Sequence, residues 1–145
     1  MFDNILLAVD GSDHSMRAAQ YAGELARALH SGMVRIVVAF EPIPDYLGEP
    51  NRQQAIDARL EKANAILQNA QQRVGKTSGE VHTELIEGSP AEAIISVART
   101  RASAVIIMGS RGLSNFKGIW MGSVSRKLVH YSDCSMLIVK VPKKE

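Results

Sequence analysis

The sequence has few of the features that mark disulfide-bonded, nucleic-acid-binding, membrane and secreted proteins. It has a single cysteine, Cys134, so no disulfide can form within the chain. Its aromatic residues are three Phe, three Tyr and one Trp, which leaves little for stacking on bases, and we expect no nucleic-acid partner. No apolar run approaches the roughly 20 residues that cross a bilayer, and the start, MFDNILLAVDGS, lacks the basic region of a secretory signal. We therefore expect a cytoplasmic protein that does not insert into membranes.

The composition fits one globular domain over residues 1–145. Apolar residues make up 46% and charged residues 22% of the chain, both ordinary values. The formal net charge of +2 is spread along the sequence. The nearest thing to a basic block, Lys140, Lys143 and Lys144, is typical of a solvated chain end rather than of a nucleic-acid-binding arm. A chain of this length can bury most of its surface in one core.

Short apolar runs alternate with helical patterns along the chain. Five runs are typical of strands: residues 5–9, 34–40, 81–86, 105–108 and 136–141. Between them, apolar residues recur at three- and four-residue steps, starting near Ser12 or Asp13, after Pro50, at Ser89-Pro90 and at Gly122-Ser123. This order predicts an α/β fold, a single open parallel sheet of five strands with helices on both faces.

The same pattern makes several local predictions. Ser12 and Ser89 are typical helix N-caps, and Pro90 suits a first helical position. The run at 81–86 alternates apolar and polar residues, as in a strand near a sheet edge. We expect Cys134 to be a buried apolar residue. The helix after Pro50 carries one apolar stripe, which predicts packing on a sheet rather than a coiled coil: Ile56, Leu60, Ala63, Leu67, Ala70 and Val74. The histidines share no metal-binding spacing, and we expect surface or helix positions for all of them: His14, His30, His82 and His130.

A glycine-rich segment, GSRGLSNFKGIWMGS, runs from Gly109 to Ser123 directly after the run at 105–108. In an open parallel sheet, ligands bind beyond the carboxyl ends of the strands, where the winding reverses. Bare glycine lets the backbone approach a phosphate, and a helix that begins at Gly122-Ser123 directs N–H groups toward an anion. Ordinary turn formation explains the glycines as well, and neither GxxxxGK[ST] nor GxGxxG occurs. The segment is therefore either a polyphosphate cradle or a set of turns.

The spacing of Gly109, Gly112, Gly122 and Ser123 resembles the G-x2-G-x9-G-[ST] pattern of the universal stress protein family, in its nucleotide-binding branch. Three more segments resemble that family in order along the chain: ILLAVDGSDHSMRAAQYAGELA, GSPAEAIISVA and SDCSMLIVK. The likeness covers essentially the whole chain and departs at Ser135, where many relatives have proline. It implies a flavodoxin-like or adenine-nucleotide-α-hydrolase-like fold that binds ATP, with AMP or ADP as alternatives and Mg²⁺ accompanying the phosphates.

The resemblance also implies roles for single residues. Asp10 would lie near the adenosine with the Ala8 backbone beside it, and Ala39 would bond the adenine edge through its main chain. The phosphates would be held at a helix start by Gly122, Ser123 and Val124. The ribose and phosphates would be wrapped by Gly109, Ser110, Arg111, Gly112, Leu113, Ser114 and Asn115. A homodimer joined through the final strands, residues 136–141, is implied as well.

The function that we expect is nucleotide-dependent regulation in a stress response, through a protein partner that the sequence does not name. Phosphoryl transfer needs a group that positions water or an acceptor, and no second carboxylate falls in the glycine-rich segment. We therefore expect no catalytic residues and little or no efficient catalysis. The alternatives are a slow ATP hydrolase, a nucleotidyl-transfer enzyme of related fold, and an interaction module that prefers AMP.

Overall fold

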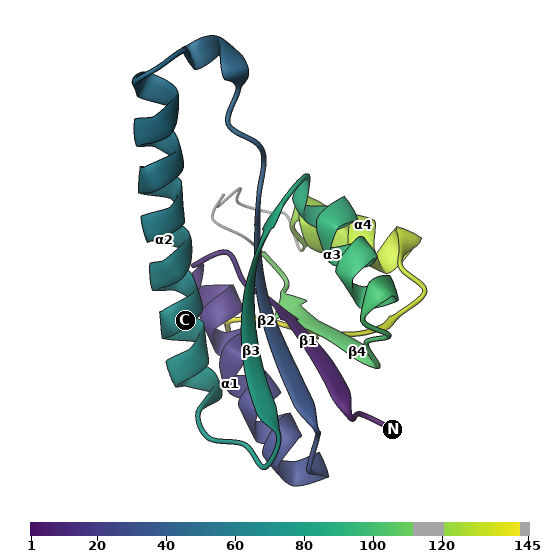
Figure 1. Cartoon of the computed structure of the whole chain (residues 1–145). Coiled ribbons are helices and arrows are strands. Elements are labelled where there is room, and N and C mark those ends of the chain that lie inside the picture. The colour runs from purple at the N-terminus through teal and green to yellow at the C-terminus, as the bar shows by residue number, and fades with distance from the viewer. Residues whose placement is uncertain (112–120, 143–145) are drawn as a thin grey trace.

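Five parallel strands form one sheet in the computed structural model, which describes residues 1–111 and 121–142 (Figure 1). Their order across the sheet is β3-β2-β1-β4-β5. The strands are β1 (Asn4–Ala8), β2 (Met33–Phe40), β3 (Glu80–Glu87), β4 (Val105–Gly109) and β5 (Ser135–Val139). The helices are α1 (Asp13–Leu29), the short 3-10 helix η1 (Asp45–Leu47), α2 (Asn51–Val74), α3 (Pro90–Thr100) and α4 (Ser123–Tyr131). The predicted single-domain α/β fold is confirmed.

Different helices cover the two faces of this sheet. Side chains alternate along a strand, so Leu7 of β1 packs in the core with α1 and α2, whereas Leu6 packs with α3 and α4. Ile106 and Ile107 of β4 divide between the two cores in the same way, and all four side chains are fully buried. Strands covered on both faces need continuous apolar runs, which is why β1 and β4 are so apolar in the sequence.

The ends of the elements differ by a few residues from the sequence pattern. β1 is Asn4–Ala8 rather than 5–9, and β5 is Ser135–Val139 rather than 136–141. Pairing with β4 starts at Ser135 and stops at Val139, which fixes β5. Val9 is buried although it lies one residue past β1. Apolar patterns report burial, while strand ends are set by pairing, so the two need not coincide. β3 lies at an edge of the sheet, as predicted.

Three helices begin at the carboxyl edge of the sheet, and their first turns differ. Ser12 caps α1, because its Oγ accepts a hydrogen bond from the Ser15 N–H at 3.2 Å, so this predicted cap is confirmed. Ser89 occupies the N-cap position of α3 and Pro90 its first turn, as predicted, but the Ser89 side chain makes no capping hydrogen bond. Gly122 is the N-cap of α4 and has no side chain that could accept a capping hydrogen bond. α3 and α4 therefore begin without a side-chain cap.

α2 extends well beyond the sheet, and η1 lies at its outer end (Figure 1). Its 24 residues span about 36 Å, whereas the eight residues of β2 span about 26 Å. The predicted apolar stripe is buried from Ala63 to Val74 but is wrong at Leu60, which is 42% exposed although it lines a pocket with Phe40 of β2 and Ile86 of β3. In the described parts of the chain, no helix combines the length and the apolarity needed to cross a bilayer.

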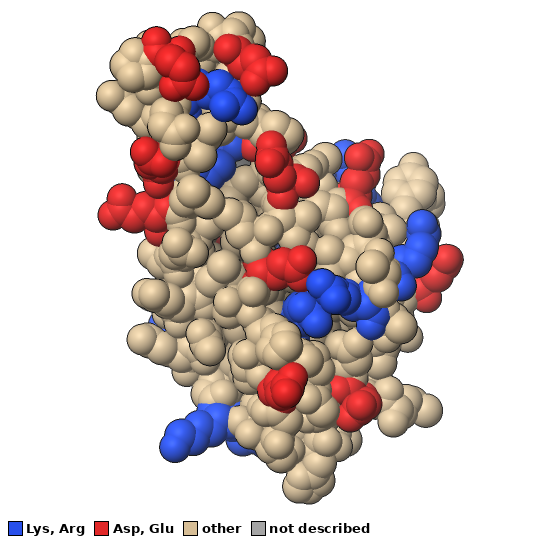
Figure 2. All heavy atoms as spheres, viewed as in Figure 1, with Lys and Arg blue, Asp and Glu red and all other residues tan. Residues whose placement is uncertain are grey.

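Acidic side chains gather at this protruding end on the face shown in Figure 2. Asp45 of η1 and Glu49 are both exposed there. The Arg52 Nε lies 3.2 Å from the Asp45 Oδ1, so one of the nearby cations already has an acidic partner. Elsewhere on the same face, lysine and arginine side chains lie among acidic ones. The protruding end is therefore a poor surface for a polyanion.

Candidate functional site

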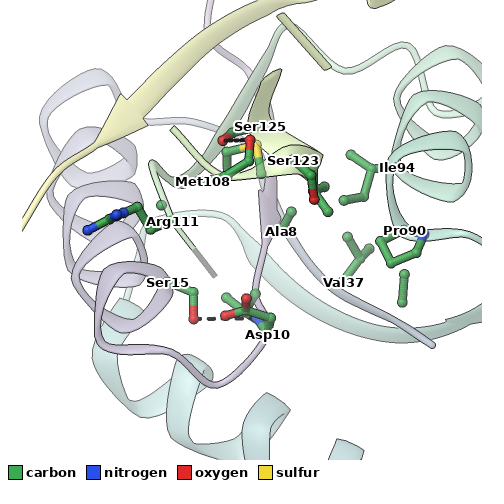
Figure 3. Close-up of a pocket in the computed structure, with 15 residues that line it drawn as sticks. Ala8, Asp10, Ser15, Val37, Pro90, Ile94, Met108, Arg111, Ser123 and Ser125 are labelled. Atoms are coloured by element: carbon green, nitrogen blue, oxygen red, sulfur yellow. Dashed lines mark hydrogen bonds between the residues drawn. The ribbon is translucent and has the colours of Figure 1, made fainter. Parts of the chain in front are cut away.

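A cavity of about 350 Å³ opens at the carboxyl ends of β1, β2 and β4 (Figure 3). The winding of the sheet reverses at this point, since β2 and β3 lie on one side of β1 while β4 and β5 lie on the other. Doubly wound sheets bind their ligands in the crevice at such a reversal. The volume falls in the range of small-molecule sites, about 300–1,000 Å³.

Most of the predicted site residues that the structure describes line this cavity. They are Ala8, Asp10, Ala39, Gly109, Arg111, Gly122, Ser123 and Val124. The exception is Ser110, which is buried behind the lining. The remaining predicted residues, Gly112, Leu113, Ser114 and Asn115, lie outside the described residues.

Several lining residues were not predicted from the sequence: Val9, Ser15, Val37, Pro90, Ile94, Met108 and Ser125. Most are apolar residues whose pattern marks only a core position. The strand register is the signal that would have found one of them, because Val37 lies opposite Ala8 in the neighbouring strand. Ile94 and Pro90 belong to α3, which reaches the cavity only because it covers this face of the sheet.

Polar and apolar groups lie on different sides of the cavity. In Figure 3, Asp10 and Ser15 lie at one end and Ser123 at the other. Pro90 and Ile94 form a third, apolar side. Such a lining suits a ligand that joins a flat apolar part to a polar part.

Asp10 forms the turn between β1 and α1 and also lines the cavity. Its Oδ1 accepts a hydrogen bond from the Ser12 N–H at 2.9 Å, the arrangement of an Asx turn. Its own N–H donates to the Ser15 Oγ at 3.4 Å. One carboxylate oxygen is thus engaged in the turn, and the carboxylate is held in place by it.

Gly109 is required by the packing of α1. A β-carbon at this position would lie 2.6 Å from the Cβ of His14 and 2.9 Å from the backbone nitrogen of Ser15. The space that a side chain would need is therefore filled by the first turn of α1. The packing of α1 is thus a reason for this glycine that the sequence did not indicate, beside the predicted approach of a phosphate.

Ser110 joins three elements next to the cavity. Its N–H donates to the Val139 carbonyl at 2.8 Å, and its carbonyl accepts from the Gly122 N–H at 2.6 Å and from the Ser125 Oγ at 3.0 Å. Its Oγ lies 3.0 Å from the Nδ1 of His14. His14 lies on α1, so its expected helix position is confirmed, but it is also partly buried and bonded to a buried hydroxyl residue, which the sequence did not indicate.

Two helix N-termini without side-chain caps border the cavity. Pro90 of α3 lines it, as do Gly122, Ser123 and Val124 at the start of α4. Gly122 has φ −68° and ψ 164°, a conformation open to any residue, so glycine is not needed there for its backbone freedom. Glycine differs from the usual N-cap residues in having no side chain that could cap the first-turn N–H groups of α4. Those groups and the helix dipole favour an anion.

The charged groups of the lining are few. Among the described residues, Asp10 is the acidic and Arg111 the basic member. Over residues 1–111 and 121–142, no three His, Cys, Asp or Glu side chains come together in a way that could hold a metal ion. A divalent cation at this cavity would take most of its ligands from the bound molecule, as Mg²⁺ commonly does with phosphates.

The fold is that of an α/β protein of the doubly wound class, with a cavity at its switch point. The model of the universal stress protein family matches residues 1–140, and the chain belongs to this family. It is 41% identical over 140 residues to the "universal stress protein in QAH/OAS sulfhydrylase 3'region" of Thermus aquaticus, a match that covers 97% of this chain and 100% of that protein.

Solved structures share the fold. The chain resembles protein MJ0577 of Methanocaldococcus jannaschii with a TM-score of 0.88 and 24% identity over 99% of each chain. It resembles a universal stress protein in complex with cAMP with a TM-score of 0.71 and 27% identity, over 93% of this chain and 94% of that one. A universal stress protein from Archaeoglobus fulgidus, solved in complex with dAMP, gives a TM-score of 0.69 at 23% identity, over 97% of this chain and 100% of that one.

Proposed function

We propose that the cavity binds an adenine nucleotide, ATP with its Mg²⁺, and that the protein is a nucleotide-dependent regulator. The observation that carries this proposal is the opening of the uncapped N-terminus of α4 onto a cavity at the switch point of the sheet. Positive helix ends with unpaired N–H groups favour phosphate. Membership of the universal stress protein family and the cAMP complex of a 27% identical relative support an adenine nucleotide.

The phosphates are proposed to lie at the start of α4. Ser123 and Val124 present first-turn N–H groups there, and the Ser123 side chain adds a hydroxyl donor. Arg111 brings positive charge from the end of β4. On the strength of the resemblance alone, the proposal extends to the neighbouring residues Gly112, Leu113, Ser114 and Asn115. Ser110 supports this end from behind the lining, through its bonds to Gly122 and Ser125.

The adenosine is proposed to lie at the opposite end, near Asp10. Ala39 fits a main-chain contact with the adenine edge. The Val9 N–H donates to the Val37 carbonyl at 2.9 Å, so Val37 directs its backbone groups toward β1. Ala39, two residues further, directs its own groups to the same side, past the end of β1. Its backbone thus faces the cavity that it lines.

The residues present fit Mg²⁺ only as a companion of the phosphates. The Ser123 hydroxyl is the candidate protein ligand at that end of the cavity. Mg²⁺ commonly keeps several waters and binds through one or two protein oxygens plus substrate phosphates. When bound, it would neutralise phosphate charge.

We propose binding without efficient hydrolysis. A hydrolase needs a group that positions water at the γ-phosphate. Asp10, the acidic residue of the described lining, is engaged with the Ser12 N–H and lies at the proposed adenosine end. Single-turnover assays with labelled ATP test this part, and release of γ-phosphate that falls in Arg111→Ala while affinity is kept would contradict it.

A homodimer through β5 is also proposed. β5 is an edge strand, and Val141 just beyond it is 36% exposed. Unpaired edge strands expose backbone donors and acceptors and invite pairing with a second chain. Pairing of two copies of β5 would continue the sheet and cover this edge.

Calorimetric titration of the purified protein, freed of any co-purified nucleotide, tests the proposed function. The titrants are Mg·ATP, AMP, cAMP and Mg·GTP. We expect saturable binding of adenine nucleotides with a preference for Mg·ATP and much weaker binding of Mg·GTP. Absence of binding by every adenine nucleotide up to about 1 mM, the weak limit of specific recognition, would overturn the proposal.

A further inference from the structure

The first turn of α1 holds the end of β4 at three consecutive residues. The Cα of Gly109 packs directly against His14. The Oγ of Ser110 lies 3.0 Å from the Nδ1 of His14. The carbonyl of Arg111 accepts a hydrogen bond of 3.5 Å from the Oγ of Ser12. The path of the chain as it leaves β4 is thus set by α1.

Ser110 also links the end of β4 to the first turn of α4. Its carbonyl accepts from the Gly122 N–H and the Ser125 Oγ, so both of its lone pairs are engaged by the first turn of α4. Ser125 is itself buried, and its Oγ also contacts the Gly122 carbonyl at 3.1 Å. Displacement of Ser110 would therefore move Gly122, and with it the N–H groups of α4 that face the cavity.

We propose that His14 is a positioning residue for the nucleotide site: through its hydrogen bond to Ser110 it sets the position of the α4 N-terminus against the cavity. His14 does not line the cavity and need not touch the ligand. Ser110 is only 2% exposed, so loss of the imidazole partner leaves its hydroxyl buried without that hydrogen bond. The expected effect of losing the His14–Ser110 bond on nucleotide affinity rests on the proposed function, whereas its expected effect on the position of α4 does not.

Two replacements of His14 separate positioning from simple packing. Asn places an amide atom at the same number of bonds from Cα as Nδ1, so His14→Asn retains a partner for Ser110, while His14→Leu removes it. Ser110→Ala removes the other half of the pair. His82→Leu is the matched control, because His82 lies on β3 away from the cavity and pairs with Glu80 at 3.0 Å.

Hydrogen exchange of the nucleotide-free protein gives the first readout. The amides of Gly122 and Arg126, whose N–H groups donate to the Ser110 and Gly122 carbonyls, should exchange about tenfold faster in His14→Leu and in Ser110→Ala, in keeping with the loss of one hydrogen bond, and His14→Asn should restore most of the protection. Unchanged exchange at these amides in both His14→Leu and Ser110→Ala would overturn the proposal. Hydrogen exchange tests the role of His14 even if the wild-type protein binds no nucleotide. Absence of nucleotide binding would contradict the proposed function but not the positioning of α4 by His14.

Affinity for Mg·ATP gives the second readout. We expect about tenfold weaker binding in His14→Leu, a similar loss in Ser110→Ala, and no further loss in the double variant, because residues that act through one bond are not additive. His14→Asn and His82→Leu should bind as wild type does. Additive losses in the double variant would show that His14 acts independently of Ser110 and would overturn the proposal.

Discussion

A β-carbon on Gly109 would lie 2.6 Å from the Cβ of His14 and 2.7 Å from its backbone carbonyl carbon. The carbonyl carbon belongs to the backbone of α1 and the Cβ is attached directly to it, so neither can move aside as the end of a flexible side chain would. We expect Gly109→Ala to lower the free energy of unfolding by about 1–3 kcal/mol, the usual cost of overpacking. Urea denaturation measures it. Gly122→Ala, at an extended N-cap position, is the control and should cost less than about 1 kcal/mol. Equal costs would contradict the packing role of Gly109.

Ser12 and Ser89 occupy equivalent N-cap positions but differ in their hydrogen bonds. The Ser12 Oγ accepts from the Ser15 N–H, whereas the Ser89 side chain makes no capping bond. Ser12→Ala should therefore cost about 1 kcal/mol of stability, while Ser89→Ala should cost no more than a few tenths. Thermal unfolding of the two variants side by side tests this difference. Similar shifts in Tm would show that Ser89 caps α3 in solution.

The fold could be predicted because its signals are local. Residues 5–9 and 105–108 are apolar throughout, which only a strand covered on both faces requires. The error in the stripe of α2, at Leu60, arose because an apolar pattern marks one side of a helix and not how completely other elements cover each residue. The missing cap at Ser89 is of the same kind, since residue type gives a position and not a side-chain orientation.

The site could be predicted only in part, because half of it is made by residues distant in the sequence. Ala8 and Ala39 were implied by the resemblance to the family and Gly122 by its glycine spacing, and all three line the cavity. Ile94 packs in the core and lines the cavity as well, since α3 covers the same face of the sheet. The bond between His14 and Ser110 joins residues 96 positions apart, and nothing in either local pattern indicates it.

Cys134 is partly rather than fully buried, and its surroundings predict a pH effect. Burial raises the pKa of the Cys134 thiol above its ordinary value, and a backbone hydrogen bond at Ile106 opposes this with a smaller effect. Below the ordinary thiol pKa of about 8.5, both folded and unfolded chains keep the proton, so the contribution to stability is constant. As the pH rises further, the unfolded chain loses its proton first, and this contribution is lost.

Cys134→Ser isolates this contribution. The difference in free energy of unfolding between wild type and Cys134→Ser should be the same at pH values below about 8 and should shrink as the pH rises toward about 10. Urea denaturation across this range measures it. Alkylation by iodoacetamide at neutral pH should also be slower than that of glutathione, because less thiolate is present. A difference that grows with pH would contradict the raised pKa.

Ile138 lies at the outer edge of β5. The Ser110 N–H donates to the Val139 carbonyl, so Val139 directs its backbone groups toward β4, and Ile138 directs its own away from the sheet. Ile138→Pro removes an outward donor without a loss in the β4–β5 ladder. We expect this variant to be monomeric by sedimentation velocity at a concentration where wild type is dimeric, with circular dichroism unchanged.

Ile138→Ala controls for the lost side-chain packing. It removes a similar contact with the core under α3 and α4 but keeps the backbone N–H, so it should remain dimeric. A dimeric Ile138→Pro would place the interface elsewhere. A monomeric wild type would contradict the proposed dimer itself.

Gly122 offers the sharpest separation of stability from binding. Its φ and ψ are those of an ordinary N-cap, so Asp is accommodated there and caps α4 with its own carboxylate. Gly122→Asp should raise the free energy of unfolding by a few tenths of a kcal/mol. It should also weaken Mg·ATP binding by far more than tenfold, because two like charges about 4 Å apart near a protein surface repel by about 4 kcal/mol.

Gly122→Ser separates the two causes of that loss. Serine caps the same N–H groups without a charge, so we expect a similar gain in stability and an intermediate affinity for Mg·ATP. Thermal unfolding and calorimetric titration of the three proteins measure both quantities. If Gly122→Asp binds Mg·ATP as wild type does while α4 is stabilised, the N–H groups at the start of α4 do not hold the phosphates. The anion would then have to lie elsewhere in the cavity.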